Sequence, residues 1–68
     1  MKDIRKIYGK KLKTFRKKKG LSQEELSFKS SLHRTYISEV ERGRRNISIV
    51  NIAKIAKALR MKIKDFFN

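Results

Sequence analysis

A stretch that predicts two short helices joined by a tight turn constrains this chain more than any other feature. The run LSQEELSFKSSLHRTYISEVERG begins at Leu21. Ser22, followed three residues later by Glu25, has the spacing of a capping box, and Leu26 is placed to form a hydrophobic staple with Leu21. We therefore expect a helix that starts directly after Ser22 and ends near Lys29.

A second short helix is expected directly after the first. Residues 30–32 form the turn, His33 stands at the N-cap, and the helix covers about residues 34–42. Ile37 and Val40 give this helix a narrow apolar stripe, which leaves most of its surface facing outward. Two helices held nearly across each other by a short turn are able to place the second helix in the major groove of DNA.

The rest of the chain shows helical periodicity and no alternation typical of strands. A helix is expected over about residues 3–19, ended by Gly20, another begins after Ser48, and a short last helix covers about residues 63–67. The apolar faces of the two longer helices consist of Ile4, Ile7, Tyr8, Leu12 and Phe15, and of Ile49, Ile52, Ile55, Ala56 and Leu59. These patterns predict an all-α fold of five helices in which residues 1–68 form a single domain.

The chain carries a large excess of positive charge. Its 20 Lys and Arg residues against 6 Asp and Glu residues give a formal net charge of +14. A field of this sign attracts nucleic acid, an anionic membrane or an acidic protein. The alternative is a charged face that is merely solvated, and the orderly helix signals argue against a disordered chain.

Several kinds of site are absent from the sequence. With no Cys and one His, the chain offers neither a disulfide nor a zinc site, and we expect no metal and no cofactor. No carboxylate pair or nucleophile with a base is arranged for catalysis, so no enzyme activity is expected. No apolar run approaches the ~20 residues that span a membrane. Without a signal peptide pattern, the expected location is the cytoplasm, with no membrane partner and no small-molecule ligand.

The residues that predict the two-helix unit also resemble a known family. The pattern SQEELS, then a turn, TYISEVERG, a polar loop and an amphipathic helix, is similar to the XRE family of phage-repressor and Cro-like helix-turn-helix regulators. The similarity covers residues 8–67 and is most specific at Gln23, Glu24, Leu26, Ile37, Glu41, Gly43 and residues 55–59. The resemblance implies a compact five-helix, lambda-repressor-like DNA-binding domain with its helix-turn-helix at about residues 22–42.

A narrower resemblance concerns KSSLHRTYISEVERGRRNISI, which is similar to the controller proteins of restriction-modification systems. It implies a stand-alone dimeric regulator of transcription, while phage-type repressors and the antitoxins of toxin–antitoxin pairs share much of the same stretch. Outside the family, a cationic helix lying on an anionic membrane is an alternative. Ser31 and Arg60 stand where the family often has Gly, and Ser31 costs of order 1 kcal/mol if its backbone is left-handed.

Four residues that point outward from the second helix of the pair are predicted to read bases. They are Arg34, Thr35, Ser38 and Glu39. Arg34 is able to hold guanine O6 and N7 in a fork worth about 1–3 kcal/mol, and Thr35 is able to place its methyl on that of thymine. Glu39 either accepts from cytosine N4 or repels wrong approaches. For Arg34 the alternative is a phosphate contact or a solvated cation.

A further set of polar residues is predicted to contact phosphate. It consists of Gln23, His33, Tyr36, Arg42, Arg44, Arg45 and Asn46. The resemblance implies the role of Gln23, and helix N-termini bind anions. The alternatives are plain N-capping for His33, core packing of the ring for Tyr36, and a solvated loop for the residues that follow. The resemblance also implies that Arg45 reaches toward the centre of the operator, where two half-sites meet.

The family resemblance implies a structural ion pair between Arg16 and Glu41. Removal of one partner from a buried pair costs roughly 3–5 kcal/mol, whereas an exposed pair is worth under about 1 kcal/mol. Neither residue is then expected to contact a base.

Apolar residues outside the core pattern predict that the chain pairs with a second copy of itself. A single helix-turn-helix contacts too few base pairs to be specific. Proteins of this type therefore bind palindromic operators with half-sites about one DNA turn apart. The predicted dimer contact consists of Val50, Met61, Ile63, Phe66 and Phe67. The alternative is that the two phenylalanines only cap the core of the monomer.

Overall fold

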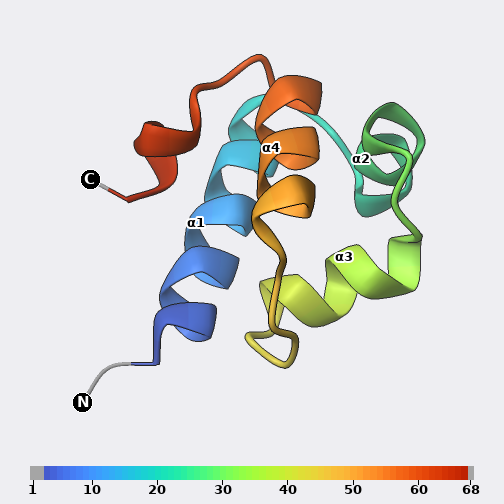
Figure 1. Cartoon of the computed structure of the whole chain (residues 1–68). Helices are drawn as coiled ribbons and strands as arrows, with labels where there is room; N and C mark the ends of the chain where they lie inside the picture. The colour runs from blue at the N-terminus through green and yellow to red at the C-terminus, as the bar shows by residue number, and fades with distance from the viewer. Residues whose placement is uncertain (1–2, 68) are drawn as a thin grey trace.

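The computed structural model describes residues 3–67, and its elements are all helical (Figure 1). They are α1 (Ile4–Lys18), α2 (Gln23–Ser30), α3 (Arg34–Glu41), α4 (Ile49–Ala58) and the 3-10 helix η1 (Ile63–Phe66). No strand occurs in residues 3–67, which agrees with the predicted all-α fold. The expected count of five α-helices is wrong, because the last segment is a 3-10 helix of 4 residues. So short a segment does not recover the cost of starting α-helical hydrogen bonding.

The helix starts follow the capping signals in the sequence. Ser22 Oγ accepts from the Glu25 N–H at 3.0 Å, and the Ser22 N–H donates to Glu25 Oε1 at 2.9 Å. The bond from the Ser22 backbone lowers the pKa of the Glu25 carboxyl. At the start of α4, Ser48 Oγ accepts from the Asn51 N–H at 3.1 Å. The observed bounds of the helices differ from the expected ones by about one residue, as frayed helix ends do.

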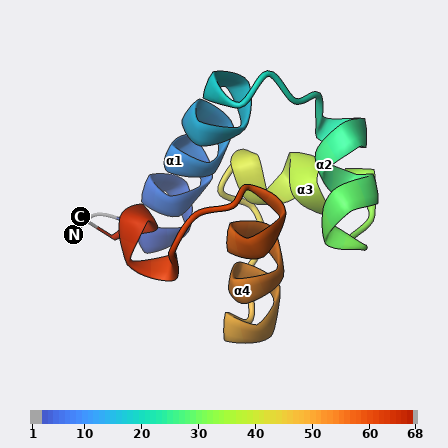
Figure 2. The ribbon, with the colours of Figure 1, turned by 90° about the horizontal axis from the view of Figure 1, so that it is seen from above.

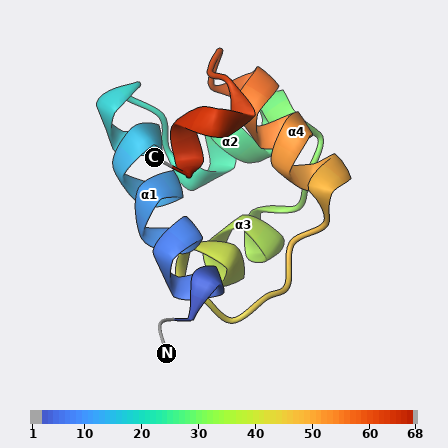
Figure 3. The same cartoon turned by 60° about the vertical axis from the view of Figure 1, so that its left-hand side comes forward.

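The helices surround a single core. α1 packs against α3, and α2 packs against both α3 and α4. After α4 the chain turns back, so that η1 contacts both α1 and α4. Figure 3 shows η1 between these two helices, and Figure 2 shows it on the opposite side of the domain from α2.

The core is built from the predicted apolar stripes and from one residue of η1. It consists of Tyr8, Leu12, Leu26, Ile37, Val40, Ile55, Ala56, Leu59 and Phe66. The ring centroid of Phe66 lies 5.2 Å from those of Tyr8 and Phe15, and Phe66 is fully buried. A buried side chain is not accessible to a second copy, so the expectation that Phe66 contributes to a dimer contact is corrected. The reason is that η1 folds back and inserts Phe66 between α1 and α4.

Two residues expected on apolar faces lie outside the core. Ile4 is 59% exposed and Ile49 is 74% exposed. Each is the first residue of its helix. The starts of α1 and α4 therefore present apolar surface to solvent.

Within residues 3–67, two residues other than glycine adopt the left-handed backbone just after a helix. Ser31 follows α2 with φ 60°, and Arg60 lies beyond α4 with φ 56°. A side chain in this region costs roughly 1–2 kcal/mol relative to the right-handed region. The two departures from the family pattern thus fall at sites where the backbone favours glycine.

Gly9 lets α1 approach the end of α3 closely. A Cβ at this position would lie 2.4 Å from the Val40 carbonyl oxygen and 2.8 Å from that of Glu41. Both are backbone atoms, which move only if α3 shifts as a whole. A glycine inside a helix is unfavourable for helix formation, so its presence here is explained by packing.

We predict that Gly9→Ala lowers the free energy of unfolding by about 1–3 kcal/mol, because overpacking outweighs the gain of about 1 kcal/mol in helix propensity. Urea unfolding followed by circular dichroism measures the difference. Lys10→Ala, at the exposed neighbouring position, is the control and is expected to stay within about 0.5 kcal/mol of wild type. A Gly9→Ala variant as stable as wild type would contradict the close contact between α1 and α3.

Candidate nucleic-acid interface

The turn between α2 and α3 sets the direction of α3. Ser27 spans the turn, because its hydroxyl donates to the Leu32 carbonyl and its own carbonyl accepts from the Leu32 N–H at 3.2 Å. Leu32 packs against the core from the middle of the turn. Figure 1 shows α3 leaving the turn at a steep angle to α2, which is the arrangement of a helix-turn-helix.

One face of α3 is buried and the other faces outward. Its apolar stripe lies in the core, whereas Arg34 and Thr35 are exposed in its first turn. Ser38 and Glu39 are half-buried further along the helix. The four predicted base-reading residues thus lie outside the core, and the two at the N-terminal end are the most accessible.

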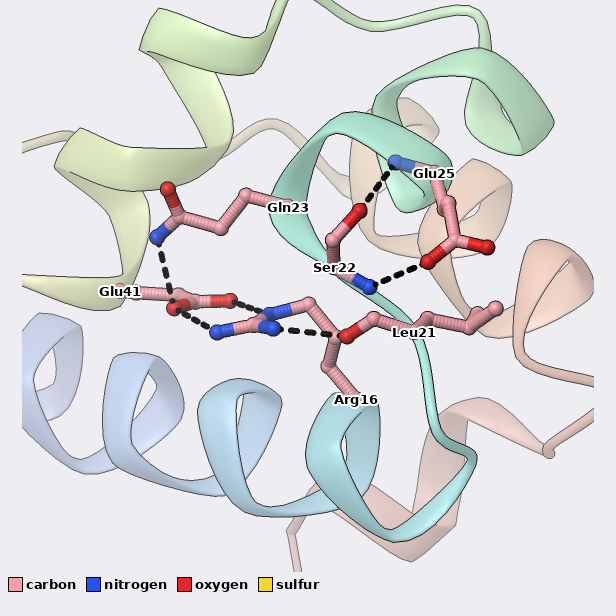
Figure 4. A network of polar contacts seen from close by, with 6 residues as sticks. All are labelled: Arg16, Leu21, Ser22, Gln23, Glu25 and Glu41. Atoms are coloured by element: carbon pink, nitrogen blue, oxygen red, sulfur yellow. Dashed lines mark hydrogen bonds and ion pairs between the residues drawn. The ribbon is translucent and has the colours of Figure 1, made fainter.

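A buried polar network holds α3 against α1 and the start of α2 (Figure 4). Arg16 Nε donates to Glu41 Oε2 at 2.6 Å, and Arg16 Nη2 donates to Glu41 Oε1 at 3.1 Å. Arg16 Nη1 donates to the Leu21 carbonyl at 2.7 Å, and Gln23 Nε2 donates to Glu41 Oε1 at 3.0 Å. The ion pair implied between Arg16 and Glu41 is therefore present, and both side chains are buried.

The same network limits what Gln23 is able to do. One N–H of its side-chain amide is committed to Glu41. The second N–H and the amide oxygen remain for the predicted phosphate contact. The bond to Glu41 was not predicted from the sequence, since nothing in the spacing of these two residues indicates that they meet.

A cluster of exposed polar residues follows α3. It consists of Arg42, Arg44, Arg45 and Asn46. Arg45 Nε donates to Glu39 Oε1 at 3.0 Å, and the Arg45 guanidinium lies 5.0 Å from the centroid of the Tyr36 ring. Two residues predicted to contact different parts of DNA, Glu39 and Arg45, thus contact each other.

The remaining two predicted phosphate contacts, His33 and Tyr36, lie at the N-cap and in the first turn of α3. His33 is the exposed N-cap of α3, but its side chain makes no capping hydrogen bond. Tyr36 is half-buried with its ring against the core, and its hydroxyl accepts from Asn51 Nδ2 at 3.1 Å. The contact of Asn51 was not predicted, because a polar residue in the first turn of a helix carries no signal for a partner fifteen residues earlier.

Exposed apolar side chains lie at the start of α4 and near the C-terminal end. Val50 is 61% exposed, Phe67 is 49% exposed and Ile63 is 38% exposed. Met61 is half-buried and packs against the core. Four of the five residues predicted for a dimer contact therefore keep accessible surface.

A groove lies beside these residues. Ile4, Tyr8, Ile47, Ile52 and Phe67 contribute to its walls. The Tyr8 hydroxyl is buried without a hydrogen-bond partner in the described chain, and burial raises the pKa of this phenol. The groove was not predicted, because Ile4 was expected in the core.

Residues 3–67 contain no group of three or more His, Cys, Asp or Glu side chains that could hold a metal ion. In the same residues, every helix is too short or too polar to cross a membrane.

Comparisons with known proteins agree with this geometry. Residues 12–66 match the helix-turn-helix protein family. The chain is 49% identical over 67 residues to control protein C.BamHI of Bacillus amyloliquefaciens. This match covers 97% of this chain and 83% of that protein. It is similar to the crystal structure of the restriction-modification controller protein C.AhdI from Aeromonas hydrophila, with a TM-score of 0.91 and 48% identity. The match covers 93% of this chain and 96% of that chain. It also resembles the controller protein C.Esp1396I, which was crystallised as a tetramer with its natural 35-base-pair operator. The TM-score is 0.89 at 37% identity, and the match covers 98% of this chain and 88% of that chain.

We predict that Glu41→Gln lowers the free energy of unfolding by roughly 3–5 kcal/mol, because the buried Arg16 charge loses its counter-charge. Thermal and urea unfolding measure the loss. Glu24→Gln removes an exposed carboxylate from α2 and is the matched control, with an expected change of about 0.5 kcal/mol or less. If both variants unfold at the same urea concentration, the buried network does not stabilise the fold.

Proposed function

The chain belongs to the XRE-type helix-turn-helix family, and on that basis we propose that it is a sequence-specific DNA-binding regulator of transcription. Its similarity to control proteins over nearly its whole length favours a restriction-modification controller within that family. Residues 1–68 act as one DNA-binding domain in this proposal, without catalytic activity. A regulator of this kind works where the DNA is, which for a bacterial controller is the cytoplasm.

The observation that carries the proposal is the presentation of α3. The first turn of α3 exposes Arg34 and Thr35, while its other end is fixed by the buried pair of Glu41 with Arg16. A rigid helix whose N-terminal side chains are accessible is what reading of the major groove requires. The net charge of +14 supplies attraction to the phosphate backbone, and exposed arginines directly follow this helix.

We assign the DNA contacts by this geometry. Arg34, Thr35 and Ser38 face base edges, and Glu39 lies on the same side of α3. The phosphate contacts are His33, Arg42, Arg44 and Asn46, together with the remaining side-chain N–H of Gln23. These are the roles that the sequence predicts for the same residues.

Two copies are required for specificity in this proposal. A dimer places two α3 helices about one DNA turn apart on a palindromic operator. Val50, Ile63 and Phe67 are the exposed apolar residues that a second copy would cover, and Ile49 adds to them. Such residues are unfavourable in water, so pairing offers them burial.

We expect the wild-type chain to select a symmetric sequence from a random pool of DNA duplexes. Arg34→Ala is predicted to relax one position in each half-site and to weaken binding of the selected duplex by about 1–3 kcal/mol. Sequencing of the selected pools and fluorescence anisotropy measure both effects.

The control for loss of one charge is Lys57→Ala, in the last turn of α4. It is expected to leave the selected sequence unchanged. If Arg34→Ala weakens every duplex to the same extent, Arg34 positions the protein and reads no base. If the wild-type chain binds all duplexes with equal strength, the proposed function is wrong.

We also predict that the wild-type chain sediments as a dimer at micromolar concentration and that Val50→Glu shifts it to a monomer. The reason is that a carboxylate at a buried contact loses its hydration without gaining a partner. Lys57→Glu introduces the same carboxylate elsewhere on α4, changes the charge by two units instead of one, and is expected to remain dimeric. A wild-type monomer over the whole concentration range would contradict pairing.

A further inference from the structure

We propose that Glu39 is a positioning residue that acts through Arg45, and that the Arg45 it holds reads DNA sequence rather than contacting phosphate. This inference rests on the proposed DNA-binding function. It replaces two separate roles, base reading by Glu39 and phosphate contact by Arg45, with a single unit.

Arg45 is held from two sides. Its Nε donates to Glu39 Oε1 at 3.0 Å, and its guanidinium lies 5.0 Å from the centroid of the Tyr36 ring. An exposed ion pair alone is weak, but a guanidinium that also lies over an aromatic face has a second contact that restricts its position. Within residues 3–67, no hydrogen bond from Nη1 or Nη2 is present, so these donors remain for an acceptor outside the chain.

The Tyr36 ring, over which the Arg45 guanidinium lies, is itself held in place. The Tyr36 hydroxyl accepts from Asn51 Nδ2 at 3.1 Å. The backbone of Asn51 is fixed in turn, because its N–H donates to Ser48 Oγ in the cap of α4. The Tyr36 ring is therefore attached to two helices, α3 through its backbone and α4 through its hydroxyl.

The backbone of the loop is attached to the same residue as the side chain. The Arg44 N–H donates to the Glu39 carbonyl at 3.0 Å. The carbonyl of Glu39 thus holds the backbone of the loop at Arg44, and its carboxylate holds the guanidinium of Arg45.

Charge distinguishes Arg45 from its neighbours. Arg42 and Arg44 are exposed, and within the described residues neither side chain has an ion pair or hydrogen bond. These free cations suit phosphate neutralisation. The Glu39–Arg45 pair has no net charge, so it contributes little to that attraction, and its carboxylate repels phosphate. What the pair offers is a directed pair of donors, which suits the O6 and N7 acceptors of guanine.

The test compares two duplexes. The first is the sequence selected by the wild-type chain, and the second is a scrambled duplex of the same composition. We expect both Glu39→Gln and Arg45→Ala to reduce the ratio of the two affinities by about tenfold. We expect the double variant to have the same ratio as Arg45→Ala alone, because Glu39 acts only through Arg45. Arg45→Lys keeps the charge but not the fork, and is expected not to restore the ratio.

Arg44→Ala is the matched control for loss of a cation in the same loop. It is expected to weaken both duplexes equally and to reduce the dependence of log affinity on log salt by about one. If Arg45→Ala behaves like Arg44→Ala, Arg45 is a phosphate contact and the inference is wrong. If Glu39→Gln reduces the ratio further in the Arg45→Ala background, Glu39 reads bases itself and the inference is also wrong.

A measurement without DNA separates this inference from the proposed function. Nitrogen-15 relaxation of Arg45 Nε is expected to report a restricted side chain in the wild type and a mobile one in Glu39→Gln. A mobile Arg45 in the wild type overturns the inference even if the chain selects DNA. A wild-type chain that selects no sequence contradicts the proposed function instead, even if Arg45 is restricted.

Discussion

The position of α3 depends above all on the buried pair of Arg16 and Glu41. Contacts between apolar side chains provide most of the driving force for folding, but they have no preferred direction. A buried guanidinium is different, because the loss of its hydration is offset only when its donors meet acceptors. Here Nε, Nη1 and Nη2 of Arg16 all donate, to a carboxylate on α3 and to the carbonyl that precedes α2. Three helices thus meet in one hydrogen-bonded arrangement.

The close approach at Gly9 acts on the same end of α3. Its nearest neighbours are the carbonyl groups of Val40 and Glu41, and the carboxylate of Glu41 is bound by Arg16 two turns further along α1. The last turn of α3 therefore contacts α1 at two points, through close packing at Gly9 and through the ion pair with Arg16. With its C-terminal end fixed in this way, and its other end fixed by the turn through Ser27, α3 has little freedom to rotate about its own axis.

Much of this arrangement could be predicted from the sequence because its signals are local. The capping box of Ser22 and Glu25, the left-handed stop at Gly20 and the apolar stripe of α3 all depend on residues a few positions apart. The pair of Arg16 and Glu41 was predicted only through the family resemblance, since residues so far apart carry no spacing signal. The burial of Phe66 and the exposure of Ile4 and Ile49 depend on how η1 folds back and on how the helices pack against one another. The contacts of Arg45 with Glu39 and Tyr36 also depend on the path of the loop, which charge and periodicity do not encode.

The separation of the two faces of α3 has a consequence for how such proteins diversify. Ile37, Val40 and Glu41 hold the helix in place, whereas Arg34 and Thr35 make no contact on which the core depends. Exchange of the outward side chains therefore leaves the free energy of folding almost unchanged, so under the proposed function a change of binding preference needs no compensating change elsewhere. Glu39 is the exception, because a change of its side chain also removes the hydrogen bond that it accepts from Arg45.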